Sequence, residues 1–210
     1  MRFEEFRKTV EAYPLISWPL IKMLTGGDRK MTLQLSRWKH NGKLIRLNKN
    51  YFILNESDRK IHPSKLHLAG ELYKPSYVSL EYALSFHGLI PERVIDLTCV
   101  TTKKTKTFIN SVGTFRYRHL KNDCFTGFTE EKDEAGLHFN LAVPEKALVD
   151  FLYLNLRRFK FGKTQPDIKD FLMESYRLQN IDALQKRKLS AYSKLFKCKK
   201  LSFLISRIAA

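Results

Sequence analysis

Residues 1 to 54 are divided by proline and glycine into three short segments with helical periodicity, and two strand-like runs follow the third segment. Pro14 ends the first segment, Gly26-Gly27 ends the second and Gly42 ends the third. Within each segment the apolar residues share one face of a helix, because they recur at spacings of three and four. They are Phe3, Phe6 and Val10, then Leu20, Ile21 and Leu24, then Met31, Leu35 and Trp38. The chain is therefore expected to begin with three short helices that bury these faces against one another.

Capping residues support the same boundaries. Ser17 can cap the second helix, and Pro19 is tolerated in its first turn. Asp28 can cap the third helix, which is expected to extend to about Asn41.

The two strand-like runs, residues 44–47 and 51–54, flank the sequence Asn48-Lys49-Asn50. Asparagine tolerates the left-handed conformation that tight turns use. We therefore expect a short β-hairpin with a basic tip.

Three helices followed by a basic hairpin is the element order of a winged helix-turn-helix. In this fold the last helix enters the major groove of DNA, and the hairpin, or wing, contacts phosphates or the minor groove. Arg37 and Gln34 have the donors to read guanine or adenine edges. The expected DNA-binding residues are Thr32, Gln34, Ser36, Arg37, Lys39, His40, Lys43, Arg46, Asn48 and Lys49. A winged helix that docks a protein is the alternative.

The chain has a formal net charge of +17, and this charge is unevenly distributed. Residues 1 to 72 carry 14 basic and 7 acidic side chains, residues 73 to 156 carry 10 of each, and residues 157 to 210 carry 14 and 4. Two basic ends around a neutral middle indicate a polyanionic partner. For any single stretch, a solvated lysine-rich face is the alternative explanation.

Three motifs follow one another along the chain: LSRWKHNGKLIRL at residues 35–47, PSYVSLEYALSFHGLIPE at residues 75–92 and AVPEKALVD at residues 142–150. Together they resemble the AbiEi family of antitoxins, which belongs to type IV toxin–antitoxin systems of abortive infection and phage defence. The family wing usually turns through a glycine before the tyrosine, whereas Asn50 precedes Tyr51 here.

The resemblance implies a winged helix-turn-helix DNA-binding domain at residues 1–72 and an α+β antitoxin domain at residues 73–210. The first is expected to bind inverted repeats in double-stranded promoter DNA and to repress transcription of its own operon. The second is expected to counteract a nucleotidyltransferase-like toxin encoded alongside, without a stable complex between the two proteins.

The second domain is expected to combine helices with a small antiparallel sheet. Ser79 can cap a helix through Phe86, with His87 at its end, and Pro144 can open another helix. Strand-like runs separated by turn residues lie between the two helices. These runs cover residues 94–100, 105–109, 114–120, 125–129 and 137–143. With the helical N-terminus and tail, the fold class is α+β.

The tail from Gln165 onward is expected to form three or four short amphipathic helices with basic outer faces. Together with the loops of the sheet, it offers a second surface for nucleic acid or for the antitoxin function, and a solvated face is again the alternative. The residues are Lys103, Lys104, Lys106, Arg116, Arg118, Lys186, Arg187 and Lys188.

Glu145, Lys146 and Asp150 are the residues that most suggest catalysis. Metal-dependent nucleases that use such acidic and lysine residues need an acid followed by Glu-x-Lys on a strand. Here Glu and Lys are adjacent, and they lie on an expected helix. The chain also lacks a phosphate-binding glycine loop and a cysteine or histidine cluster with metal-ligand spacing. We therefore expect no enzymatic activity, no cofactor and no metal, and keep an enzyme acting on nucleic acid as the alternative.

Three widely spaced cysteines, with no signal peptide, indicate reduced thiols and a cytoplasmic location. No run reaches the roughly 18 apolar residues of a membrane span, so no membrane partner is expected. The final LSFLISRIAA is too short to span, and a membrane-surface role for the basic tail is disfavoured.

Overall fold

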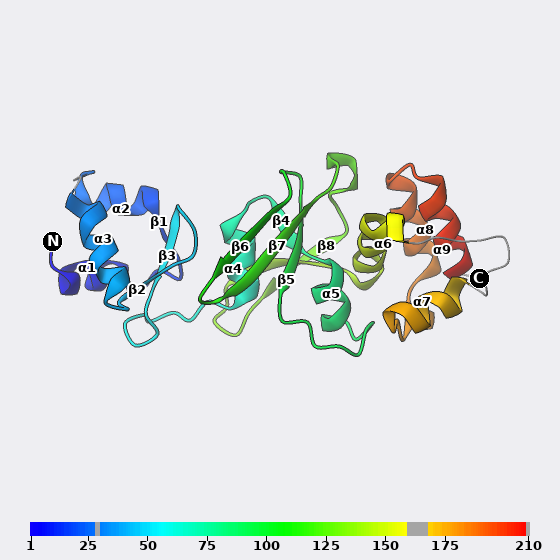
Figure 1. Ribbon diagram of the computed structural model, residues 1–210, viewed down its shortest axis with the longest axis horizontal. Helices are drawn as coiled ribbons and strands as arrows, with labels where there is room; N and C mark the ends of the chain where they lie inside the picture. Colours follow the sequence, from blue (N-terminus) through cyan, green and yellow to red (C-terminus); the bar gives the residue numbers. More distant parts are fainter. Residues whose placement is uncertain (28–29, 159–167, 209–210) are drawn as a thin grey trace.

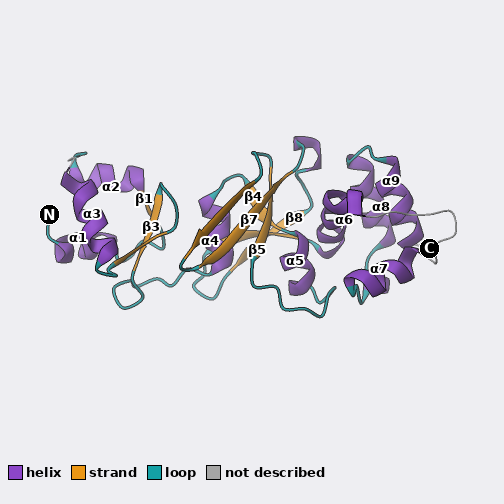
Figure 2. Cartoon of the chain, in the orientation of Figure 1, coloured by secondary structure: helices purple, strands orange, loops and turns teal. Residues whose placement is uncertain are grey.

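The computed structural model describes residues 1–27, 30–158 and 168–208, and Figure 1 shows them as an elongated molecule. Helices lie at both ends of the long axis, and the larger β-sheet lies between them (Figure 2). The predicted cap at Asp28 and the predicted start of the helical tail at Gln165 lie outside the described residues.

Three helices and a three-stranded sheet form the N-terminal end. The helices are α1 (Phe3–Val10), α2 (Trp18–Thr25) and α3 (Lys30–His40), and the strands are β1 (Ile16–Ser17), β2 (Leu44–Arg46) and β3 (Tyr51–Leu54). The predicted apolar residues of the three helices form one core, against which Leu20 and Leu24 are half-buried. The prediction of three helices followed by a hairpin is confirmed.

The boundaries of α2 follow the sequence signals. The backbone N–H of Leu20 donates a hydrogen bond of 3.2 Å to the Ser17 hydroxyl oxygen, as an N-cap requires. Gly26 ends the helix with a φ of 59°, a left-handed conformation that glycine adopts without steric cost.

The hairpin differs from its prediction in two respects. Strand β1 adds a third, antiparallel strand beside β3, and a strand of two residues is too short to leave a periodic signal. The tip does not use the left-handed conformation at either Asn48 or Asn50. Instead Oδ1 of Asn48 accepts hydrogen bonds from the backbone N–H groups of Asn50 (2.8 Å) and Tyr51 (3.0 Å), so a side chain closes the turn.

A six-stranded sheet in the order β6-β7-β5-β4-β9-β8 forms the middle of the molecule. The prediction of a small antiparallel sheet is wrong, because β5 pairs with β7 and β4 pairs with β9 in parallel. All residues of β5 are buried, which suits a central strand, whereas the exposed, lysine-bearing β6 lies at an edge. The strands are β4 (Ser76–Val78), β5 (Leu97–Thr101), β6 (Lys106–Asn110), β7 (Gly113–His119), β8 (Phe128–Lys132) and β9 (His138–Ala142).

Helices pack on this sheet and build the C-terminal end. Helix α4 contacts β4, β5 and β9, α5 contacts β5 and α6, and α6 also contacts α8 and α9. They are α4 (Lys65–Leu72), α5 (Leu80–Phe86), α6 (Pro144–Asn155), α7 (Ile168–Tyr176), α8 (Lys186–Leu195) and α9 (Lys199–Ile208), with short 3₁₀ turns at Asn122–Cys124, Leu156–Arg158 and Ile181–Ala183. The helical tail is thus confirmed, although the apolar residues near Ile181 form a 3₁₀ turn.

The larger sheet and the helices packed on it enclose a second core of the molecule. A polar cluster lies inside this second core. Lys146 and Asp150 are one helical turn apart on α6, have no exposed surface and form an ion pair. The hydroxyl groups of Tyr77 and Ser79 donate hydrogen bonds of 2.7 Å and 2.9 Å to Oδ2 of Asp150. The prediction that Ser79 caps α5 is therefore right about its position and wrong about its side chain, which bonds Asp150 and makes no capping bond.

The hairpin at the N-terminal end also packs against the second core. Leu47 and Ile53 belong to the core of the larger sheet, whereas Leu44 and Phe52 belong to the N-terminal core. The side-chain amide of Asn110 donates a hydrogen bond of 3.1 Å to the carbonyl oxygen of Leu47. These contacts fix the hairpin against the edge of the larger sheet that carries β6.

Candidate nucleic-acid interface

Helix α3 has one buried side and one exposed polar side. Met31, Leu35 and Trp38 are buried, and the Trp38 ring packs against Phe6 and Phe3, with ring centroids 4.9 Å and 5.4 Å apart. This packing sets the rotation of the helix about its axis. The side turned to solvent carries Thr32, Leu33, Ser36, Arg37, Lys39 and His40, all exposed, with Gln34 half-buried at its margin.

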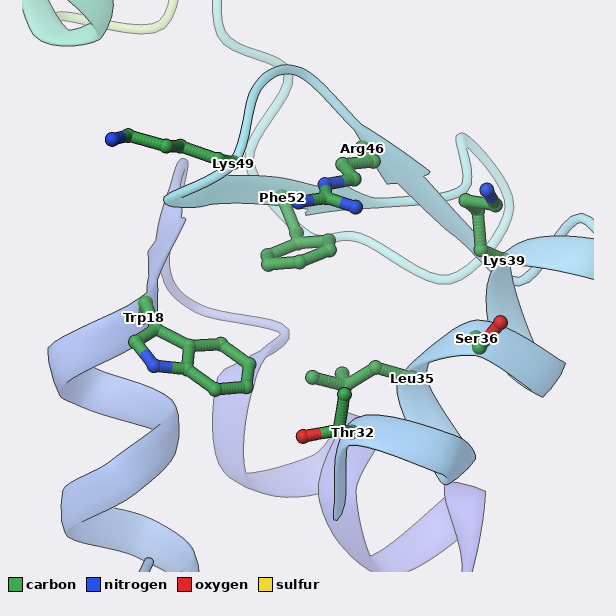
Figure 3. Close-up of a pocket in the computed structure, with 8 residues that line it drawn as sticks. All are labelled: Trp18, Thr32, Leu35, Ser36, Lys39, Arg46, Lys49 and Phe52. Carbon is green, nitrogen blue, oxygen red and sulfur yellow. The ribbon is translucent and has the colours of Figure 1, made fainter. Parts of the chain in front are cut away.

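A hollow of about 320 Å³ separates the exposed side of α3 from the hairpin. Trp18, Leu35 and Phe52 point into it from α2, α3 and β3, as Figure 3 shows. Polar residues from α3 and cationic residues from both elements complete its lining: Thr32, Ser36, Lys39, Arg46 and Lys49. The hollow therefore has an apolar floor and a basic rim.

Three hydrogen-bonding arrangements fix the hairpin tip beside this hollow. The Asn48 side chain closes the turn as described above, and the Nε–H of Arg46 donates a hydrogen bond of 2.9 Å to the carbonyl oxygen of Asn48. The backbone N–H of Trp18 donates a hydrogen bond of 2.7 Å to the carbonyl oxygen of Asn50. The tip is thus tied to the start of α2, so that Lys49 has a defined position relative to α3.

The basic residues of this surface are not neutralised by neighbouring acids. Within the described part of the chain, no carboxylate lies at ion-pair distance from Arg37, Lys39, Arg46 or Lys49. Arg37, Lys39 and His40 also occupy the last turn of α3, where the helix dipole favours positive charge. The surface is therefore suited to an anionic partner.

The structure places the predicted DNA-binding residues in four different settings. Thr32, Ser36, Lys39, Arg46 and Lys49 line the hollow, whereas Gln34, Arg37 and His40 lie on the rest of the α3 surface. Asn48 is half-buried and shapes the turn. Lys43 lies apart from the hollow, with its ammonium group 4.4 Å from the centre of the Phe3 ring of α1.

The second predicted basic surface is not one surface. Arg116 is paired with Asp96 at 2.8 Å, and Arg118 donates a hydrogen bond of 3.4 Å to the carbonyl oxygen of Leu154. Lys186, Arg187 and Lys188 begin α8, which Figure 1 places near the opposite end of the molecule from α3. Lys103, Lys104 and Lys106 lie instead at the end of the sheet that faces the hairpin tip, and Lys103 and Lys106 line a hollow together with Lys49.

Sequence reasoning missed the apolar floor of the first hollow. Leu35 was assigned to the core, Phe52 was placed only within a strand-like run, and Trp18 received no role. The available signal was Trp18 itself, a large aromatic residue directly after the Ser17 cap, which remains only half-buried in the structure.

The candidate catalytic residues of the sequence are inaccessible. Glu145 is 5% exposed and accepts a hydrogen bond of 3.1 Å from the backbone N–H of Gln185, while Lys146 and Asp150 are fully buried. His87, at the end of α5, bonds the carbonyl oxygen of Ala142 at 2.7 Å through Nε2, which is a structural contact. Across residues 1–27, 30–158 and 168–208, no group of three or more potential metal ligands lies together.

No known protein-family profile and no curated protein sequence matches this chain. None of the helices that the structure describes is long and apolar enough to cross a membrane.

Proposed function

We propose that the protein binds double-stranded DNA sequence-specifically, with α3 in the major groove and the β2–β3 hairpin as a wing. The observation that carries this proposal is the pairing of two surfaces. The polar, cationic side of α3 is exposed, and the basic hairpin tip is fastened beside it across a hollow of about 320 Å³.

The arrangement of α3, the hairpin and the hollow between them matches the grooves and backbone of a DNA duplex. The major groove admits an α-helix, and side chains of the exposed face then reach base edges. A helix in one groove and a wing in the next must leave room for the sugar–phosphate backbone between them. The hollow lies at that place, and Lys39, Arg46 and Lys49 on its rim supply charge for phosphates.

The resemblance to the AbiEi family extends this proposal to a biological role. In this proposal the protein represses its own operon at inverted repeats, and residues 73–210 counteract a nucleotidyltransferase-like toxin. Antitoxin and toxin need not form a stable complex. The location in the cytoplasm, where promoter DNA would be available, is part of the same proposal.

The DNA-binding proposal is tested by selecting duplexes from a randomised pool and measuring affinity at increasing salt. A protein with six to ten phosphate contacts loses about three to five orders of magnitude in affinity between 50 and 200 mM salt. We expect Arg37→Ala to reduce the ratio of affinities for selected and random duplexes, and Lys49→Ala to weaken both equally. Lys132→Ala, an exposed site on the far edge strand β8, is the control. Absent or salt-independent binding would contradict the proposal.

The antitoxin role is tested by co-expression with a nucleotidyltransferase-like protein encoded beside this gene. The full-length Arg37→Ala/Lys49→Ala variant is expected to lose repression of a promoter reporter and still to restore growth. Failure of the natural protein to restore growth would refute the antitoxin role and leave DNA binding unaffected.

A further inference from the structure

A second hollow of about 320 Å³ lies on the other side of the hairpin tip, between the hairpin and the end of the larger sheet. Its lining comes from sequence-distant elements: the tip at Asn48–Asn50, the C-terminal end of α4 with Tyr73 and Lys74, and the start of β6 with Lys106 and the preceding Lys103. Lys49 lines both this hollow and the one beside α3. The two basic surfaces are therefore continuous through the wing tip.

Aromatic rings hold the lysines of this second hollow in place. The ammonium group of Lys103 lies 5.4 Å from the Tyr73 ring centre, and that of Lys106 lies 5.7 Å from Tyr73 and 4.9 Å from the Phe108 ring centre. These cation–π contacts leave the positive charge intact. Pre-positioned cations lose less side-chain entropy when they bind an anion than freely rotating lysines do.

The loop that carries Lys103 is also anchored through its backbone. The Tyr73 hydroxyl donates a hydrogen bond of 3.1 Å to the carbonyl oxygen of Lys104, and the Lys103 N–H donates one of 3.1 Å to the Thr101 hydroxyl oxygen. Nδ1 of His119 lies 3.0 Å from the Lys103 carbonyl oxygen. The lysines thus project from a fixed backbone.

The charge balance of this hollow is positive. Four lysines and a single carboxylate, Glu71, line it, and Glu71 is paired with Lys74 at 2.6 Å. No carboxylate of the described residues lies at ion-pair distance from Lys49, Lys103 or Lys106. Three uncompensated cations thus surround a space open to an anion.

We infer that Lys103 and Lys106 bind backbone phosphates of the same DNA duplex, in the flank beyond the base pairs that α3 and the wing contact. This inference rests on the proposed function and extends it, because it assigns to the second domain a direct part in DNA binding. Phosphate contacts carry no direct sequence information, so the contribution of these two lysines is independent of base sequence.

The test compares the full-length natural protein with Lys103→Gln/Lys106→Gln on two duplexes, one that ends at the wing-contacted base pairs and one extended by a further helical turn on that side. Each phosphate contact contributes about 0.9 to the slope of log affinity against log salt. We therefore expect the variant to lose about 2 from this slope on the long duplex and nothing on the short one. Hydroxyl-radical protection of the flank should disappear as well.

Lys132→Gln/Lys194→Gln is the matched control, because it removes the same charge at exposed sites on β8 and α8. It is expected to bind both duplexes like the natural protein. If the Lys103→Gln/Lys106→Gln variant matches this control on the long duplex, the inference is wrong and the proposed function stands. If the natural protein binds no duplex at all, the proposed function itself fails.

Discussion

The hydroxyl group of Tyr77, on β4, donates a hydrogen bond of 2.7 Å to Oδ2 of Asp150, on α6, and both side chains are buried. Lys146 donates to Tyr77 at 2.8 Å and pairs with Asp150, so that one network joins the sheet to the helix. Burial disfavours both charges: it raises the pKa of Asp150 and lowers the pKa of Lys146. The network holds only because each group has a partner.

Removing one partner of this buried pair should cost far more stability than removing both. We expect Asp150→Ala to lower the free energy of unfolding by about 3 to 5 kcal/mol, because Lys146 is left as an unpaired buried charge. Lys146→Met/Asp150→Leu should cost less. Urea denaturation followed by circular dichroism measures both, and equal losses in the two variants would contradict this account.

The two tryptophans, Trp18 and Trp38, both lie in the N-terminal part. Tryptophan fluorescence therefore follows the unfolding of this part alone, whereas circular dichroism follows the whole chain. Asp150→Ala should therefore move the circular-dichroism transition more than the tryptophan-fluorescence transition. Identical shifts would mean that the two cores unfold as one cooperative unit.

The Asn48 side chain closes the wing turn with two hydrogen bonds. We expect Asn48→Ala to lower the free energy of unfolding of the N-terminal part by about 1 kcal/mol and to weaken DNA binding, since Lys49 loses its fixed position. Asn50→Ala is the control, because the carbonyl oxygen of Asn50, which accepts from Trp18, is retained. Tryptophan fluorescence during heating and anisotropy titration give the two readouts, and equal behaviour of the two variants would count against a role for the Asn48 side chain.

Leu33 is 65% exposed in the middle of the polar face of α3. An apolar side chain in the major groove contacts the C5-methyl group of thymine. We expect one thymine-to-uracil change in the selected duplex to weaken the natural protein by about 0.8 kcal/mol, about fourfold, as the burial of one methyl group predicts. The Leu33→Ala variant should not distinguish thymine from uracil. If the Leu33→Ala variant still binds the thymine duplex more tightly than the uracil duplex, a residue other than Leu33 contacts the methyl group.

Asp133 links the turn between β8 and β9 to the start of α4. Burial raises its pKa, but hydrogen bonds from Ser64, Leu137 and Ala135 outweigh this effect and hold the pKa below its ordinary value of 3.8. A carboxyl group with a lowered folded-state pKa stabilises the protein above its unfolded-state pKa, and this stabilisation is lost as the pH falls through the folded-state value. Asp133→Asn should therefore destabilise the protein at pH 7, and this destabilisation should shrink as the pH falls through the folded-state pKa, which lies below 3.8. Urea denaturation of the natural protein and the variant at pH 7 and at pH 3 checks this. If their difference in free energy of unfolding is the same at both pH values, the pKa of Asp133 does not contribute to stability in this way.

The local elements at the N-terminus were predictable because their signals are local. Helix periodicity placed Met31, Leu35 and Trp38 in the core, and the Ser17 cap and Gly26 stop bounded α2 within a few residues. The small antiparallel sheet was predicted wrongly because alternation identifies a strand without identifying its neighbours. β7 lies between β5 and β6, and the fully buried β5 is a central strand of the sheet. This order depends on the apolar surface that each strand buries in the fold, which alternation within one strand does not specify.

The sequence by itself determined the three helices, the hairpin, the exposed polar side of α3 and the residues that carry positive charge. Only the tertiary structure decided which of these cations act together, because spacing along a chain does not specify distances between separate elements. It paired Arg116 with Asp96, brought Lys103 and Lys106 to Lys49, and buried Lys146 beside Asp150. These outcomes follow from how the two cores pack around the hairpin, where Leu47 and Phe52 bury their side chains in different cores.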